Sequence, residues 1–167
     1  MKKDRRGWLL LISALIIALD RWTKTWVEHH VAEGDAITVI PHYFSITHVL
    51  NPGAAFSLFT NTSTPGRTRW MLTWFSIAAA VIVVALLLKI GKHFTATSVA
   101  LALILGGALG NVWDRVQSGV VTDFLEVYLR WGSWSYHWPD FNIADSAIVC
   151  GGILILLDAF FAKKTPA

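Results

Sequence analysis

Four aspartates carry the chemistry that this sequence suggests: Asp20, Asp114, Asp123 and Asp145 all stand in or beside long apolar stretches. A charge in apolar surroundings is costly, so each of these residues is a candidate functional group. Two carboxyl groups that share one site cannot both ionise cheaply, so one keeps its proton, and the pair then supplies a general base and a general acid. Such a pair can activate a water molecule against an amide bond.

Polar side chains accompany these acids along the chain. Asn51 opens the segment Asn51-Pro52-Gly53-Ala54-Ala55-Phe56-Ser57, Asn111 precedes Asp114 and Arg115, and Asn142 lies three residues before Asp145. Amide and guanidinium groups can donate hydrogen bonds to carboxylates and hold them in place. The sequence therefore predicts a polar site built around some of the four acids.

Other reaction centres have less support in the sequence. A Ser–Lys dyad would need a lysine close to the acids, and Lys24 pairs more simply with Asp20 one helical turn away. The six histidines lie in segments where a solvated or interfacial ring is the ordinary explanation. No C-x-x-C or clustered His/Cys spacing suggests a metal site, and we expect neither a metal nor a cofactor. The single Cys150 is expected to be a packed core thiol.

The composition indicates that the elements positioning these residues are membrane spans. Hydrophobic residues make up 54% of the chain and charged residues 15%, against roughly 45–50% and about 25% in soluble proteins. Nine tryptophans against three tyrosines fit the preference of indole rings for the membrane–water interface. These values exclude disordered, collagen-like and disulfide-rich classes. They predict an all-α membrane protein that forms one domain over residues 1–167.

Charge-free runs locate the spans, because about 20 apolar residues cross a hydrocarbon core of about 30 Å. The runs from Trp70 to Leu88 and from Phe94 to Trp113 contain no Asp, Glu, Lys or Arg. Four transmembrane helices are predicted, at about residues 7–26, 69–88, 94–113 and 143–162. Within them, Gly106 and Gly110 form a Gly-x-x-x-Gly spacing and Gly151-Gly152 follow later, which predicts close helix packing.

Cations near the span ends predict the orientation, because Lys and Arg are retained in the cytoplasm. Eight of the 14 cations lie in three short segments: Lys2, Lys3, Arg5, Arg6, Lys89, Lys92, Lys163 and Lys164. Both termini are therefore predicted to be cytoplasmic. No small-x-small cleavage site follows the first apolar run, so we expect an uncleaved anchor. Asp158, near the cytoplasmic end, is expected to meet Lys163 or Lys164.

The two long segments that this topology places outside, about 27–69 and 114–142, are patterned as strands. β-branched and aromatic residues between Ile37 and Ile46 flank a Pro41-His42 turn, and residues 120–130 lead through Gly132-Ser133 into residues 134–138. Such patterns are typical of hairpins. We expect a small β-sheet on the outer face of the membrane, with the four acids at the depth of that interface.

Five ordered stretches of the chain match a known set of motifs. They are Asp20-Arg21-Trp22-Thr23-Lys24, Asn51-Pro52-Gly53-Ala54-Ala55-Phe56-Ser57, Gly106-Gly107-Ala108-Leu109-Gly110-Asn111-Val112-Trp113-Asp114-Arg115, Gly119-Val120-Val121-Thr122-Asp123-Phe124 and Phe141-Asn142-Ile143-Ala144-Asp145-Ser146-Ala147. Together they resemble the successive motifs of signal peptidase II, the bacterial lipoprotein signal peptidase family. Their order and spread over most of the chain make the resemblance specific.

The resemblance implies a four-helix intramembrane aspartyl peptidase of the bacterial inner membrane, with its active site near the periplasmic face. It implies cleavage of diacylglyceryl-modified prolipoproteins just before the lipidated cysteine. The partners would be these substrates and membrane lipids, without nucleic acid. Carried onto matching positions, the catalytic pair is Asp123 and Asp145. The family's other polar site positions fall on Asn51, Gly53, Asn111, Arg115 and Asn142, and its supporting positions on Asp20, Lys24 and Asp114.

Some of these residues have a structural alternative. Asp114 and Arg115 either form an ion pair that caps the third span or contact substrate. For Asp20 and Lys24, the sequence favours a structural ion pair. Asp145 also suits the first turn of a helix, where the positive end of the dipole favours an acid.

Rival functions belong to other classes. A proton-coupled transporter would hold its acids near the bilayer midplane, and a structural subunit would need no converging acids. A presenilin-type protease would carry Gly-x-Gly-Asp, which the sequence lacks.

Overall fold

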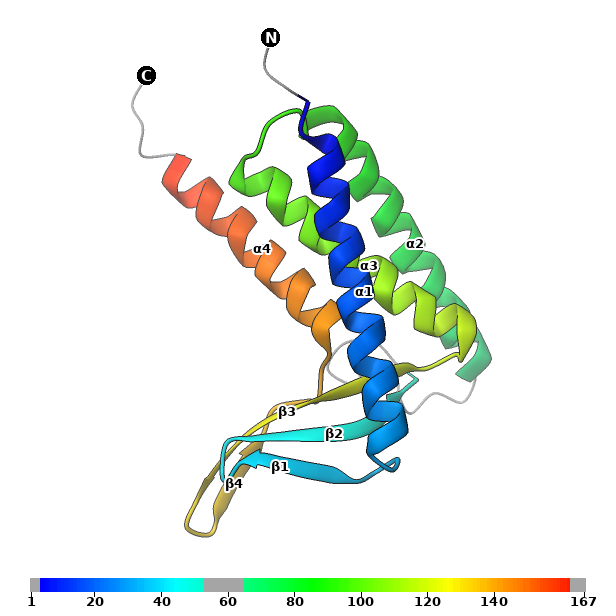
Figure 1. Cartoon of the computed structure of the whole chain (residues 1–167), viewed down its shortest axis with the longest axis vertical. Helices are drawn as coiled ribbons and strands as arrows, with labels where there is room; N and C mark the ends of the chain where they lie inside the picture. The colour runs from blue at the N-terminus through cyan, green and yellow to red at the C-terminus, as the bar shows by residue number, and fades with distance from the viewer. Residues whose placement is uncertain (1–3, 53–64, 163–167) are drawn as a thin grey trace.

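The computed structural model of the chain describes residues 4–52 and 65–162. Figure 1 shows a helical bundle with a sheet at one end, while α1 begins and α4 ends at the opposite end. The elements in chain order are α1 (Arg6–His30), β1 (Ala36–Ile40), β2 (Phe44–Asn51), α2 (Pro65–Ile90), α3 (Ala96–Gln117), β3 (Val121–Trp131), β4 (Trp134–His137) and α4 (Ile143–Ala162). The prediction of a mostly helical chain with a small sheet is confirmed.

In the part of the chain that the structure describes, three helices are long and apolar enough to cross a membrane, where the sequence predicts four: Arg69–Ile90, Ala96–Gln117 and Ile143–Phe161. Their outer flanks carry large apolar side chains with little cover, since Phe75 on α2 is 74% exposed and Leu156 on α4 is 70% exposed. Contiguous exposed apolar surface of this kind suits a membrane environment. In α1, which is equally long, charged residues at Asp20, Arg21 and Lys24 interrupt the apolar run.

Three helices, α1, α2 and α3, extend beyond their predicted limits, and α3 also begins later than predicted. α3 begins at Ala96 rather than residue 94 because Thr95 caps it. The Thr95 hydroxyl accepts a hydrogen bond from the Ser98 N–H at 3.1 Å, and the Ser98 hydroxyl accepts one from the Thr95 N–H at 2.9 Å. This capping box satisfies amides that a helix start leaves unpaired. α3 also continues to Gln117, and α1 to His30, so Asp114 and Lys24 are both helical.

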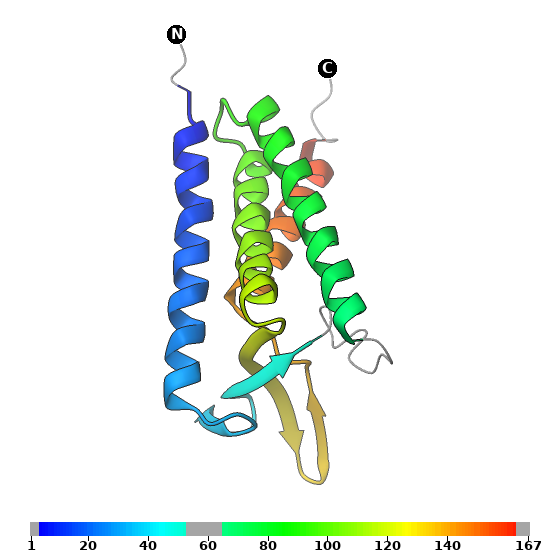
Figure 2. The same cartoon turned by 90° about the vertical axis from the view of Figure 1, so that its right-hand side faces the viewer.

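α3 lies between the other helices and packs against α1, α2 and α4 (Figure 2). A Cβ atom at Gly107 would lie 2.2 Å from the Ala144 carbonyl oxygen, and one at Gly110 would lie 2.9 Å from the Asp20 carboxylate. Only glycine permits this approach of α3 to both α4 and α1. The predicted close packing is confirmed at Gly106, Gly110 and Gly151, but it is wrong for Gly152, where a Cβ atom would meet open space.

The sheet has the order β1-β2-β3-β4, and all neighbouring strands are antiparallel. The turn between β1 and β2 passes through His42 with φ 72°, and the turn between β3 and β4 passes through Gly132 with φ 58°. Both turns lie where the sequence predicts them. The predicted sheet is therefore confirmed in its strands and its hairpins.

β3 is held in place by its pairing with β2 and by an apolar contact with α1. β2 and β3 pair from Phe44 opposite Val127 to Asn51 opposite Val121. A small apolar cluster of Val27, Val31 and Phe124 joins the last turns of α1 to β3. Because Phe124 faces this cluster, its neighbour Asp123 points to the other side of the strand.

Candidate active site

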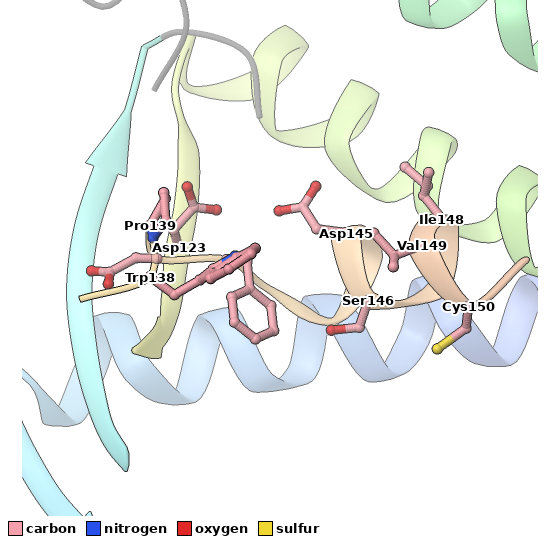
Figure 3. A pocket seen from close by; sticks show the side chains of 10 residues that line it. Asp123, Trp138, Pro139, Asp145, Ser146, Ile148, Val149 and Cys150 are labelled. Carbon is pink, nitrogen blue, oxygen red and sulfur yellow. The ribbon is translucent and has the colours of Figure 1, made fainter. Parts of the chain in front are cut away.

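A cavity of about 430 Å³ lies where the sheet meets α4. Its lining residues are Asp123, Trp138, Pro139, Asp140, Phe141, Asp145, Ser146, Ile148, Val149 and Cys150. Figure 3 shows the carboxyl groups of Asp123 and Asp145 pointing toward one another from β3 and from the first turn of α4. Two of the four candidate acids therefore converge on one largely apolar cavity.

Asp123 is held by two amide side chains. Asn51 donates a hydrogen bond to Asp123 Oδ2 at 2.8 Å, and Asn142 donates one to Asp123 Oδ1 at 2.7 Å. The pairing of β2 with β3 brings Asn51 into reach, since Val49 lies opposite Asp123 and Asn51 follows two residues later. The carboxyl group is thus oriented from both sides while only 3% of the residue is exposed.

Asp145 owes its position to the start of α4. Asn142 precedes the helix, and its Oδ1 accepts the Asp145 N–H at 2.9 Å. This is an N-cap hydrogen bond, which satisfies one unpaired amide of the first turn. Asn111 on α3 donates from Nδ2 to Asp145 Oδ1 at 2.8 Å. Asn142 therefore contacts both acids, through its amide nitrogen on one side and its oxygen on the other.

A buried lysine fixes the orientation of Asn111. Lys24 is fully buried, and its Nζ lies 2.7 Å from Asp20 Oδ2 and 2.6 Å from Asp114 Oδ2. It also donates to Asn111 Oδ1 at 3.3 Å. Because the amide oxygen of Asn111 faces Lys24, its nitrogen is directed at Asp145. The expected pairing of Asp20 with Lys24 is confirmed.

Asp20 also contacts α4 directly. Its Oδ1 accepts the backbone N–H of Ala144 at 3.0 Å, in the first turn of the helix. A carboxylate there satisfies a free amide and interacts favourably with the helix dipole. Asp20, on α1, therefore holds the start of α4, and α4 is the helix that carries Asp145.

Asp114 and Arg115 face different partners. Asp114 pairs with Lys24 and with Arg21, both from α1. Arg115 donates from Nη1 to the Asn111 carbonyl oxygen at 3.4 Å, and its charge interacts with the carboxylates of Asp145, Asp123 and Asp114. Asp114 thus ties α3 to α1, and Arg115 places a positive charge near both candidate acids.

The electrostatic state of Asp123 follows from its surroundings. Burial and, to a smaller extent, the neighbouring charge of Asp145 raise the pKa of the Asp123 carboxyl to about 7, against the lowering effect of the hydrogen bonds from Asn51 and Asn142. A carboxyl group of this kind holds a proton near neutral pH, when an ordinary aspartate does not. The site can therefore present a proton donor on β3 opposite a carboxylate on α4.

The structure does not confirm the expectations for Gly53, Asp158 and Cys150. Gly53 lies outside the described residues, as do Lys163 and Lys164. Asp158 accepts a hydrogen bond from the Thr97 hydroxyl of α3. The prediction that Cys150 is a packed core thiol is wrong, because its side chain is exposed and lines the cavity. α4 is apolar on every side, so its sequence did not reveal which face packs.

Several contributing residues were not predicted from the sequence. Arg21 pairs with Asp114, and Thr122 donates to Glu28 Oε1 at 2.8 Å beside Asp123. Asp140 lines the cavity and accepts from Thr47 Oγ1 at 3.0 Å. The position of Arg21 within a long apolar run could have predicted an ion pair, since a charge in apolar surroundings requires a partner. Within residues 4–52 and 65–162, no group of three or more His, Cys, Asp or Glu residues is arranged to hold a metal ion.

The chain is similar to known proteins in both sequence and structure. The family described as "Signal peptidase (SPase) II" matches residues 12–161 of the chain. A lipoprotein signal peptidase of Pseudomonas fluorescens is 42% identical over 163 residues, which cover 96% of this chain and 91% of the relative. One from Solibacter usitatus is 44% identical over 156 residues, covering 93% and 92%. A solved structure described as a bacterial membrane enzyme is 31% identical and superposes with a TM-score of 0.81, covering 100% of this chain and 99% of that one.

Proposed function

The chain belongs to the signal peptidase II family, and on this premise we propose that it cleaves diacylglyceryl-modified prolipoproteins just before the lipidated cysteine. Asp123 and Asp145 are the proposed catalytic residues of an aspartic endopeptidase. The observation that carries the proposal is the convergence of these two acids on one cavity, each held by amide side chains.

The proposed reaction begins with a water molecule between the two acids. Asp145, as the carboxylate, takes a proton from this water, whose oxygen attacks the scissile carbonyl carbon. Asp123, as the protonated acid, donates its proton to the carbonyl oxygen, which gives a neutral tetrahedral intermediate. Asp145 then passes its proton to the departing nitrogen, Asp123 recovers its own from the intermediate, and the C–N bond breaks. Neither acid changes its state over a full cycle, and no metal or cofactor takes part.

Asn142 and Asn111 act in this proposal as positioning residues. Asn142 holds the carboxyl group of Asp123 and the backbone of Asp145, so it links the positions of the two acids. Asn111 holds Asp145 Oδ1, and Lys24 holds Asn111. A general base that is already oriented loses little entropy in the transition state, which lowers the barrier.

We further propose that α1 is a fourth membrane span and that residues 1–167 form one peptidase domain in the bacterial inner membrane. Its buried charges support this proposal, because Asp20 and Lys24 face protein partners on α3 and α4 rather than lipid. With both termini in the cytoplasm, the sheet and the cavity beside it lie at the periplasmic face.

This topology predicts a labelling pattern. A cysteine introduced at Gly132, in a Cys150→Ser background, should react with a membrane-impermeant thiol reagent added to intact cells whose outer membrane is permeable. A cysteine at Lys92 should react only after the inner membrane is opened. Labelling of both positions from outside would contradict the four-span arrangement.

Comparison of a lipidated precursor with its unlipidated form tests the proposed function. The acyl chains can stay in apolar surroundings while the scissile bond reaches the acids, and each buried CH₂ contributes about 0.8 kcal/mol. Purified protein in detergent should therefore cleave the diacylglyceryl precursor and leave the unlipidated one nearly intact. Equal rates on the two precursors would contradict the proposed specificity.

The pH dependence of cleavage should be bell-shaped, with its basic limb near pH 7. Asp123 must be protonated, and its pKa is raised to about 7, so activity falls as pH rises through that value. At low pH the pair takes up a second proton and no carboxylate is left to act as the base, so both limbs belong to the coupled pair. Asn51→Ala removes a donor that favours ionised Asp123, so it should move the basic limb to higher pH. A flat profile between pH 4 and 9, with chemistry rate-limiting, would contradict the shared-proton mechanism.

A further inference from the structure

The cavity has two chemically different ends. Figure 3 shows Ile148, Val149 and Cys150 along α4 at one end, and Trp138 and Pro139 at the other, beside Asp123. The α4 end lies within a helix apolar enough to cross a membrane. The other end belongs to the segment that joins β4 to α4, at the level of the sheet.

A third carboxylate, that of Asp140, lines this outer end. It is half-buried and accepts a hydrogen bond from Thr47 Oγ1 on β2 at 3.0 Å. Its charge also interacts with those of Glu126 and His137, which pair with one another at 2.7 Å. Asp140 therefore adds a negative charge to the outer end, beside the pair formed by Glu126 and His137.

The path of a substrate through the cavity gives this charge a role. Acyl chains belong at the apolar α4 end, and the scissile bond belongs between Asp123 and Asp145. The mature part of the precursor must leave toward the aqueous side, so it passes Asp140. A carboxylate there attracts cationic side chains and repels anionic ones, and its partial burial limits screening by solvent.

We propose that Asp140 is a specificity-determining residue that favours Lys or Arg, and disfavours Asp or Glu, immediately after the lipidated cysteine. This inference rests on the proposed function. Burial raises the pKa of the Asp140 carboxyl, against the hydrogen bond from Thr47. A substrate cation beside it favours the ionised form and pairs with it at the same time.

The test uses diacylglyceryl-modified peptides that differ only in the two residues after the cysteine: Lys-Lys, Gln-Gln or Glu-Glu. The wild-type protein should prefer Lys-Lys over Glu-Glu by about tenfold in kcat/KM, as expected for a partly screened charge contact. Asp140→Asn should reduce this ratio to about threefold or less, and Asp140→Glu should keep the preference. The change should lie mainly in KM, since Asp140 is not one of the two proposed catalytic acids.

Glu33→Gln is the matched control. It removes the same charge from an exposed residue between α1 and β1 that does not line the cavity, and it should keep the wild-type ratio. Each ratio compares kcat/KM for two peptides on one protein preparation. Partial unfolding of a variant lowers both values equally, so it does not change the ratio.

Two results would overturn the proposal: an unchanged ratio in Asp140→Asn, or an equal loss of preference in Glu33→Gln. Cleavage of the Gln-Gln peptide by the wild-type protein would support the proposed function even if the proposal for Asp140 fails. If no peptide is cleaved, the proposed function fails and this inference fails with it.

Discussion

Replacing Asp123 or Asp145 by asparagine is expected to lower the turnover number by about three orders of magnitude or more. Asparagine matches aspartate in shape but can act neither as a general base nor as a general acid. Because the two acids act as a unit, the double variant should be little worse than either single one. The measurement is kcat on a lipidated precursor, with substrate affinity and thermal stability followed in parallel.

The two substitutions differ in their structural cost. Asp145 accepts one hydrogen bond from Asn111, which an asparagine can still accept through its oxygen. Asp123 accepts from both Asn51 and Asn142, so an asparagine there turns one of these contacts into a donor facing a donor. We expect Asp123→Asn to lose about 1–3 kcal/mol of stability and Asp145→Asn to lose less. Asp145→Asn is therefore the cleaner test of chemistry.

Glu33→Gln serves as the control, since it changes an exposed acid that does not line the cavity. It should retain wild-type turnover, and chelators should not affect the wild-type protein. Turnover near the wild-type value in both aspartate variants would contradict the proposed mechanism. So would loss of activity in EDTA that added zinc restores.

Lys24→Met should lower the free energy of unfolding by about 3–5 kcal/mol, the range observed when one partner of a buried ion pair is removed. Methionine fills a similar volume but leaves the buried carboxylate of Asp20 without its cation and that of Asp114 with Arg21 as its remaining ion-pair partner. Unfolding in detergent, followed by tryptophan fluorescence, measures the loss. Activity should fall too, because Asn111 loses the contact that orients it.

Arg21→Met is the matched comparison, since Arg21 contacts the same Asp114 but its side chain is 25% exposed. It should cost less stability than Lys24→Met. Adding Asp20→Asn and Asp114→Asn to Lys24→Met removes the unpaired charges and should recover most of the loss. Equal stability of Lys24→Met and the wild-type protein would show that the buried pairs contribute nothing.

Local patterns in the sequence were enough to predict most of the elements. Charge-free runs located α2 and α3, and turn residues at His42 and Gly132 located both hairpins. The helix ends were less accurate, since the cap at Thr95 depends on two hydroxyl groups whose geometry the apolar run does not reveal. The prediction that α1 is a span is not matched by its apolar content, because Asp20, Arg21 and Lys24 interrupt the apolar run and need partners elsewhere in the chain.

The candidate site was predicted in part, for a related reason. The pair Asp20 and Lys24 is four residues apart on one helix, so spacing alone predicts it. The partners of Asp114 come from a helix about ninety residues earlier, and only the packing of α3 on α1 brings them together. Cys150 was misplaced because hydrophobicity on every side of α4 does not distinguish a packed face from a cavity wall.

The buried ion pairs have a consequence for how the chain enters the membrane. During synthesis α1 emerges before α3, and its half nearest the sheet carries two cations, Arg21 and Lys24, and two anions, Asp20 and Glu28. The compensating Asp114 follows only with α3. We expect α1 to stay near the insertion machinery or the lipid headgroups until α3 arrives and Asp114 pairs with both cations. Completion of membrane insertion and assembly of the site would then be a single event.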